Sequence, residues 1–87
     1  MNKLKYFTAS WCGPCRFFRP TIEELKDEGK NIEIIDIDED RLESQKYEVM
    51  SVPTLVFERS TGEIYARTSG VIPKDTVVEA LNHPENG

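Results

Sequence analysis

Two thiols lie close together in this chain, which has only two cysteines, Cys12 and Cys15. At this spacing they can form a reactive dithiol, supply half of a metal site, or be inert core residues. A structural zinc site needs four ligands, and the single histidine, His83, brings the total to three. Gly13 and Pro14, between the cysteines, are typical of a turn and a helix start rather than of a core. The pattern therefore favours a redox dithiol and no metal site.

A helix that begins at Gly13 would favour a thiolate at Cys12. The first N–H groups of a helix lack intrahelical partners, and the helix dipole places partial positive charge there. Arg16 and Arg19 add positive charge. We therefore expect Cys12 to be the exposed nucleophile with a lowered pKa. Residues three apart on a helix are ~5–6 Å apart, so Cys15 can reach Cys12 to form a disulfide.

The composition predicts one small domain, 1–87. Apolar residues make up 38% of the chain and charged residues 31%, and no run approaches the ~18 apolar residues of a membrane span. The first ten residues lack the apolar core of an export signal, so we expect a cytoplasmic protein. The net charge of −5 argues against a nucleic-acid binder. Residues 1–22 nevertheless carry four basic residues and no acidic one.

Hydrophobic periodicity predicts the order β-α-β-α-β-β-α. The first half is typical of a parallel crossover and the second of an antiparallel hairpin followed by a helix. We therefore expect an α/β fold with a four-stranded mixed sheet and helices on both faces. The expected elements are a strand at Lys3–Thr8, a helix from Gly13 to near Gly29, a buried strand at Ile32–Ile37, a short helix through about Tyr47, strands at Thr54–Phe57 and Glu63–Thr68, a helix opening at Pro73 with Val77, Val78 and Leu81 inward, and a frayed tail at 83–87.

Several residues near these elements have simple structural interpretations. Phe17 and Phe18 are expected in the core, His83 in the solvated tail, and Trp11 over the dithiol. The aspartates at 36, 38 and 40 imitate a calcium loop, but the loop's sixth position is arginine and its twelfth is tyrosine. We interpret them as a strand end and a helix cap.

Two segments together resemble the thioredoxin family. Trp11–Arg16, with the sequence WCGPCR, is similar to that family's active-site motif, and Pro20 falls where thioredoxins carry a helix-kinking proline. Tyr47–Leu55 is similar to the segment around the family's cis-proline. The resemblance covers the chain from Lys3 to Leu81. It implies a thioredoxin-like fold in which Val52–Pro53 is cis and faces the dithiol.

The resemblance also assigns roles to individual residues. Cys12 and Cys15 are the implied catalytic pair, and a redox-active disulfide takes the place of any cofactor. The implied substrate-binding residues are Trp11, Gly13, Pro14, Val52, Pro53, Gly70 and Val71.

The chain also departs from the family pattern. It lacks the extra N-terminal strand and helix of full-length thioredoxins, which predicts a minimal version of glutaredoxin-like size. Tyr6 stands where many thioredoxins bury an aspartate that is thought to accept a proton from the second cysteine. The lysine that often pairs with that aspartate is absent, since the matching strand reads Ile34-Ile35-Asp36.

The function predicted from these features is that of a protein-disulfide reductase and electron carrier. Cys12 would attack a target disulfide, Cys15 would resolve the mixed disulfide, and an NADPH-linked thioredoxin reductase would recycle the protein, which we expect to be a monomer. One alternative is a glutaredoxin-like protein recycled by glutathione, which the stretch Thr68–Ile72 weakens because it lacks that family's Gly-Gly and acidic pair. Another is a partner-binding module on the same fold.

Overall fold

The computed structural model describes residues 1–84 and contains, in that part of the chain, four strands and three helices. Their order confirms the predicted β-α-β-α-β-β-α succession. The elements are β1 (Lys3–Thr8), α1 (Gly13–Asp27), β2 (Ile32–Asp36), α2 (Arg41–Lys46), β3 (Thr54–Glu58), β4 (Ile64–Ser69) and α3 (Lys74–Leu81).

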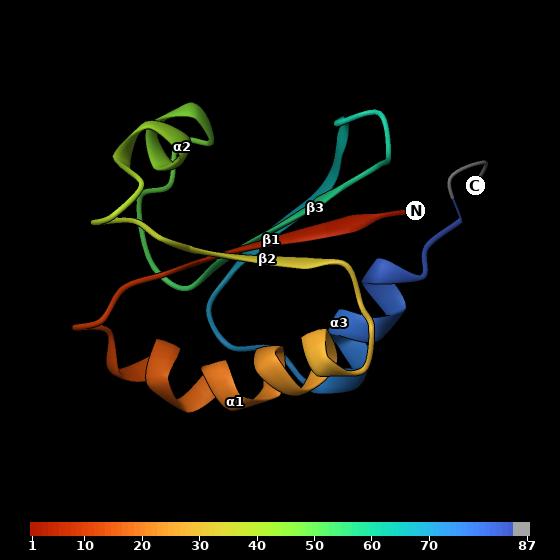
Figure 1. Ribbon diagram of the computed structural model, residues 1–87, viewed down its shortest axis with the longest axis horizontal. Helices are drawn as coiled ribbons and strands as arrows, with labels where there is room; N and C mark the ends of the chain where they lie inside the picture. The colour runs from red at the N-terminus through yellow and green to blue at the C-terminus, as the bar shows by residue number, and fades with distance from the viewer. Residues whose placement is uncertain (85–87) are drawn as a thin grey trace.

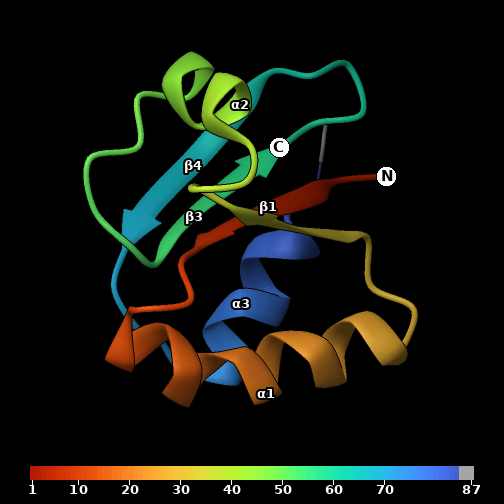
Figure 2. The same ribbon diagram turned by 60° about the vertical axis from the view of Figure 1, so that its left-hand side comes forward.

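The strands form one mixed sheet in the order β2-β1-β3-β4 (Figure 2). β1 pairs with β2 in parallel and with β3 antiparallel, and β3 and β4 form the expected antiparallel hairpin. Since β2 pairs only with β1, it is an edge strand, and Ile34 within it is only half-buried. The expectation of a buried strand at Ile32–Ile37 is therefore wrong in part, and the strand ends at Asp36.

The helices cover both faces of the sheet, as predicted: α1 and α3 lie on one face and α2 on the other (Figure 1). Alternation along β1 sends Leu4 and Tyr6 toward α1 and α3, and Lys5 and Phe7 toward α2. The main core lies on the side of the two longer helices. Its buried residues are Leu4, Tyr6, Phe18, Ile22, Leu25, Ile32, Leu55, Phe57, Val77 and Leu81.

Helix α1 packs through residues spaced three and four apart. Its buried residues are Cys15, Phe18, Ile22 and Leu25. Gly29 follows with a φ of 92°, and its N–H donates to the Lys26 carbonyl at 3.0 Å, which is how a glycine ends a helix. With 15 residues α1 is the longest helix, and within residues 1–84 no helix has the length and apolar character needed to cross a membrane.

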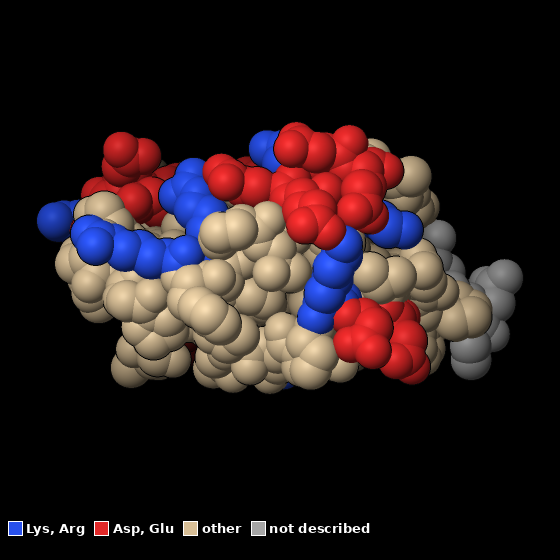
Figure 3. All heavy atoms as spheres, turned by 90° about the horizontal axis from the view of Figure 1, so that it is seen from below, with Lys and Arg blue, Asp and Glu red and all other residues tan. Residues whose placement is uncertain are grey.

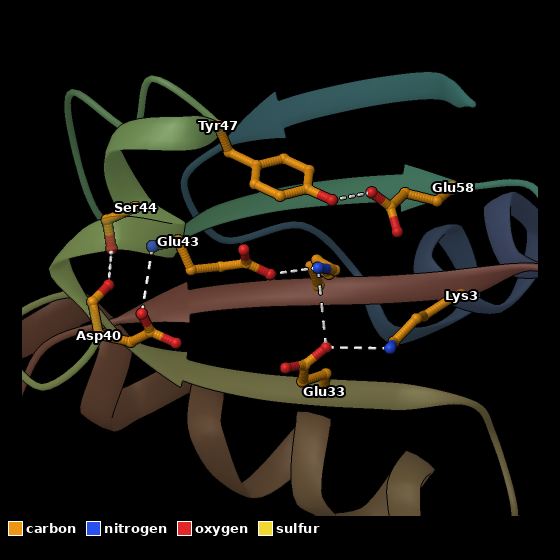
Figure 4. Close-up of polar contacts among 8 residues, drawn as sticks. Lys3, Glu33, Asp40, Glu43, Ser44, Tyr47 and Glu58 are labelled. Atoms are coloured by element: carbon orange, nitrogen blue, oxygen red, sulfur yellow. Dashed lines mark hydrogen bonds and ion pairs between the residues drawn. The ribbon is translucent and has the colours of Figure 1, made fainter. Parts of the chain in front are cut away.

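An ionic cluster lies between α2 and the sheet (Figure 4). Lys5 on β1 donates to the Glu43 carboxylate on α2 and lies 3.9 Å from Glu33 on β2. Its ammonium group also sits 4.6 Å from the centre of the Tyr47 ring, and Tyr47 donates its hydroxyl hydrogen to Glu58 on β3. The cluster therefore ties α2 to three strands at once.

The two ends of the described chain meet at the right-hand side of Figure 1. The Asn2 amide donates to the carbonyl oxygens of Leu81 at 3.0 Å and His83 at 2.7 Å. The His83 ring stacks on Tyr65 with centroids 5.8 Å apart, and its carbonyl accepts a bond from Arg59 at 3.0 Å. The expected fraying is thus wrong at His83, which these contacts hold, whereas the expected exposure of His83 to solvent is confirmed. Residues 85–87 lie outside the described residues.

Candidate active site

Helix α1 begins at the two cysteines. Cys12 is the N-cap residue, with extended backbone angles, and Pro14 occupies the first turn, where a missing N–H costs nothing. Cys12 and Cys15 are disulfide-bonded, with Cα atoms 5.2 Å apart. The backbone N–H of Cys15 also donates to the sulfur of Cys12 at 3.2 Å. The predicted reach between the two cysteines is confirmed, and one N–H of the first helical turn, which has no partner within the helix, donates to the Cys12 sulfur.

The surroundings of Cys12 correct one expectation. Its exposed fraction is 5%, so in this disulfide form it is buried rather than exposed. Ala9 shares a small apolar cluster with the two cysteines, and the half-buried Ile37 and Val52 pack against it. The sulfur of Cys12 lies 3.7 Å from the Val52 carbonyl oxygen. The cover comes partly from residues that are distant in sequence, which the local pattern around the cysteines could not indicate.

The second predicted segment reaches the disulfide through Val52. The Val52–Pro53 peptide bond is cis, as the resemblance implied, and it directly precedes β3. Gly70 donates its N–H to the Pro53 carbonyl at 2.9 Å and has a φ of 89°, a conformation that side chains disfavour. Val71 follows and is exposed. The segments around Cys12, Pro53 and Gly70 therefore meet at one end of the central strands.

Trp11 lies beside the cysteines with most of its ring exposed. Its indole N–H donates to Asp38 at 2.8 Å, so the turn between β2 and α2 holds the ring. The other two aspartates have the predicted roles: Asp36 at the end of β2 accepts the Asp38 N–H at 2.8 Å, and Asp40 caps α2. Sequence reasoning missed the contact of Asp38, because nothing local links it to a residue 27 positions away.

Residues 1–84 contain no group of three or more His, Cys, Asp and Glu side chains that could hold a metal ion. The disulfide has the Cys15 N–H and the Val52 carbonyl oxygen as polar neighbours. A disulfide at a helix start can be broken and formed again by thiol–disulfide exchange.

Comparison with known proteins identifies the family. The family model described as Thioredoxin matches residues 2–83. The chain belongs to the thioredoxin family. Thioredoxin from Staphylococcus epidermidis is 42% identical over 83 residues, which is 92% of this chain and 79% of the relative. Thioredoxin from Bacillus subtilis is 42% identical over 79 residues, 87% of this chain and 75% of the relative.

Solved thioredoxin structures agree with the fold. A mutant thioredoxin from Halobacterium salinarum has a TM-score of 0.81 at 32% identity, covering 92% of this chain and 71% of that one. Fasciola hepatica thioredoxin gives the same score and identity, with coverage of 92% and 77%. With its bonded cysteine pair, this thioredoxin-family chain is a thiol-disulfide oxidoreductase, and its predicted fold and enzyme class are confirmed.

Tyr6 occupies the position at which the sequence departs from many thioredoxins. The side chain is fully buried, and its hydroxyl donates to the Cys15 carbonyl at 3.4 Å. Its ring packs edge-on against Phe18, 5.8 Å away. Burial raises the pKa of Tyr6 above its usual value, so the group is neutral at physiological pH. The space behind the second cysteine therefore holds a neutral hydroxyl in this thioredoxin-family protein.

Two further side chains of α1 differ from expectation. Phe17 is 77% exposed, so its assignment to the core is wrong, whereas Phe18 is buried as predicted. Arg19 forms an ion pair with Glu23 at 3.3 Å, which offsets part of the positive charge expected to act on the cysteines. Arg16 donates to the Ser10 carbonyl at 3.3 Å, close to the start of the helix.

Proposed function

We propose that the protein reduces disulfides in other proteins, with Cys12 as nucleophile and Cys15 as resolving thiol. The observation that carries this assignment is the place of the disulfide: Cys12 caps α1 and accepts the Cys15 N–H, while Cys15 lies inside the first turn. Such a position favours a thiolate at Cys12. Cys12 is also the less deeply buried of the two cysteines, with an exposed fraction of 5% against 1% for Cys15, which supports its role as the sulfur that meets the target.

The reaction then consists of two exchanges. The Cys12 thiolate attacks one sulfur of the target, the target disulfide breaks, and the leaving sulfur takes up a proton. The Cys15 thiol loses its proton to solvent and attacks Cys12, which releases the second target sulfur as a thiol. The target gains two electrons and two protons, and the protein returns to the bonded form described above.

Around this centre we propose a substrate-binding groove. Its residues are Trp11, Gly13, Pro14, Val52, Pro53, Gly70 and Val71. Support comes from the contact between the Val52 carbonyl oxygen and the Cys12 sulfur, from the exposure of Trp11 and Val71, and from the hydrogen bond that holds Gly70 beside Pro53.

The wider setting is part of the same proposal. The protein would work as one domain, 1–87, as a cytoplasmic monomer that transports electrons with its disulfide as the only redox group. An NADPH-linked thioredoxin reductase would supply the electrons, and neither nucleic acid nor a membrane would be a partner. The family membership and the net charge of −5 support this setting.

The test combines turnover with trapping. Insulin reduction is followed with NADPH and thioredoxin reductase, and in parallel with glutathione and glutathione reductase. We expect turnover with thioredoxin reductase; turnover with glutathione alone would replace the proposal by a glutaredoxin-like function. On a non-reducing gel of cell extract, Cys15→Ser should retain target proteins as reducible adducts and Cys12→Ser should not. Equal amounts of adduct from both variants would contradict the roles assigned to Cys12 and Cys15.

A further inference from the structure

Phe17 is a large apolar side chain that the protein leaves in contact with solvent. It follows Arg16 on α1, and its ring does not join the buried face formed by Phe18 and its neighbours. Instead it borders an open groove of about 570 Å³ between α1 and the loop that leads from β4 to α3. Thr21 lies on the same wall, and Val71, Ile72 and Pro73 form the opposite wall. Helix and loop thus present an open groove whose lining is mostly apolar.

The groove continues from the proposed substrate-binding residues. Val71 belongs to both, because it follows Gly70, whose N–H is bonded to the Pro53 carbonyl at 2.9 Å, and it also lines the groove beside Phe17. A chain segment that lies along Gly70 and Val71 would therefore pass directly into the groove. This continuity makes the flanking segment of a target protein the natural occupant.

The charges at the groove favour an apolar occupant. Lys74 also lines the groove, but it donates to Glu24 and to Glu28, the latter at 3.3 Å, so its charge is already compensated. Seen from the side of α1 and α3, a broad surface is free of charged side chains, with basic side chains along its edge at the end where α1 begins and acidic side chains gathered farther along (Figure 3). An aliphatic or aromatic side chain would bury apolar surface there without leaving a charge unpaired.

We propose that this Phe17 groove is a specificity subsite that takes an apolar side chain of the target, a few residues from the cysteine that Cys12 attacks. The inference rests on the proposed reduction of protein disulfides and adds a substrate class to it: disulfides flanked by an aliphatic or aromatic residue. Small disulfides lack that flank and gain nothing from the subsite.

The experiment compares peptide substrates that differ at one position. Each peptide carries one disulfide and a single leucine at one of five positions on either side of the attacked cysteine, with serine elsewhere. We expect leucine at one or two positions to raise kcat/KM about 10-fold, mainly by lowering KM. Phe17→Ala should abolish this advantage, and so should Thr21→Trp, which fills the groove. Both variants should reduce 2-hydroxyethyl disulfide at the rate of the unmodified protein.

Leu42→Ala is the matched control, because Leu42 is 81% exposed and lies on α2, across the sheet from the groove. It should keep the preference for leucine. The inference is overturned if no leucine position is preferred, if Phe17→Ala keeps the preference, or if Phe17→Ala slows peptide and small disulfide equally. Failure of the unmodified protein to reduce any disulfide would instead refute the proposed function, and the subsite with it.

Discussion

Replacing Lys5 by methionine tests the ionic cluster that attaches α2 to the sheet (Figure 4). Methionine keeps the apolar stem of the side chain and removes the ammonium group. The side chains of Lys5 and Glu43 are 11% and 20% exposed, so this pair is much closer to a buried pair than to a surface one. Breaking a buried pair from one side costs ~3–5 kcal/mol and an exposed pair ~0–1, so we expect a loss of about 2–3 kcal/mol in the free energy of unfolding at pH 7.

The loss should depend on pH. Burial alone would lower the pKa of Lys5, but its hydrogen bonds with Glu43 and Tyr47 outweigh burial and raise the pKa. The hydrogen bond from Lys5 lowers the pKa of Glu43 against the opposite effect of burial. A carboxylate whose pKa is lowered by folding stabilises the folded state at pH values above its pKa in the unfolded chain, ~4.3. A lysine whose pKa is raised by folding stabilises the folded state at pH values below its pKa in the unfolded chain, ~10.4. The pair therefore contributes fully between about pH 5 and 10, and its contribution fades as Glu43 is protonated in acid.

The assay is urea unfolding of the unmodified protein and the variant at pH 7 and pH 3.5. The difference in the free energy of unfolding between the unmodified protein and the variant should shrink to below about 1 kcal/mol at pH 3.5, where an unpaired Glu43 is largely neutral. Lys3→Met is the control: Lys3 pairs with Glu33 at 2.9 Å in a more exposed position and should cost about 0.5 kcal/mol or less. An equal loss for Lys5→Met at both pH values, or an equal effect of Lys3→Met, would show that the paired charge does not hold α2.

The remaining predictions use the same unfolding measurement. Tyr6→Phe should cost about 0.5–1 kcal/mol, because the bond that it removes is long at 3.4 Å; a loss above about 3 kcal/mol would contradict this weak bond. Gly70→Ala should cost about 1–2 kcal/mol through its φ of 89° alone, since no atom lies within 4 Å of the added carbon, whereas Gly13→Ala should be nearly neutral. Reducing the disulfide Cys12–Cys15 should lower stability by about 2 kcal/mol, as expected for a closed loop of about four residues; no change would refute the loop-entropy estimate.

Local patterns in the sequence were enough to predict the order of elements, and the resemblance to thioredoxins predicted the meeting of the two site segments. The failures share a physical cause, which is that burial depends on contacts between distant residues. Cys12 is covered partly by Val52, 40 positions away, so its own neighbours indicated exposure. Phe17 was assigned to the core by residue type, although the spacing of Phe18, Ile22 and Leu25 places it on another side of α1.

The buried ionic cluster shows the same limit. Lys5 is a charged residue in a strand, and no residue near it in the sequence indicates that it will contact Glu43 and Tyr47. Alternation along β1 does place Lys5 on the face opposite Tyr6, so the direction of the side chain was predictable. Its partners depend on where α2 docks, which only the folded structure gives.

The bonds from Asn2 to Leu81 and His83 have a practical consequence for handling the protein. They hold both ends of the described chain together at the end of the molecule that lies opposite the disulfide (Figure 1). A tether attached beside Asn2 or His83 would therefore lie away from the disulfide. Immobilised on an electrode or resin by such a tether, the protein should keep its redox pole turned toward the solution.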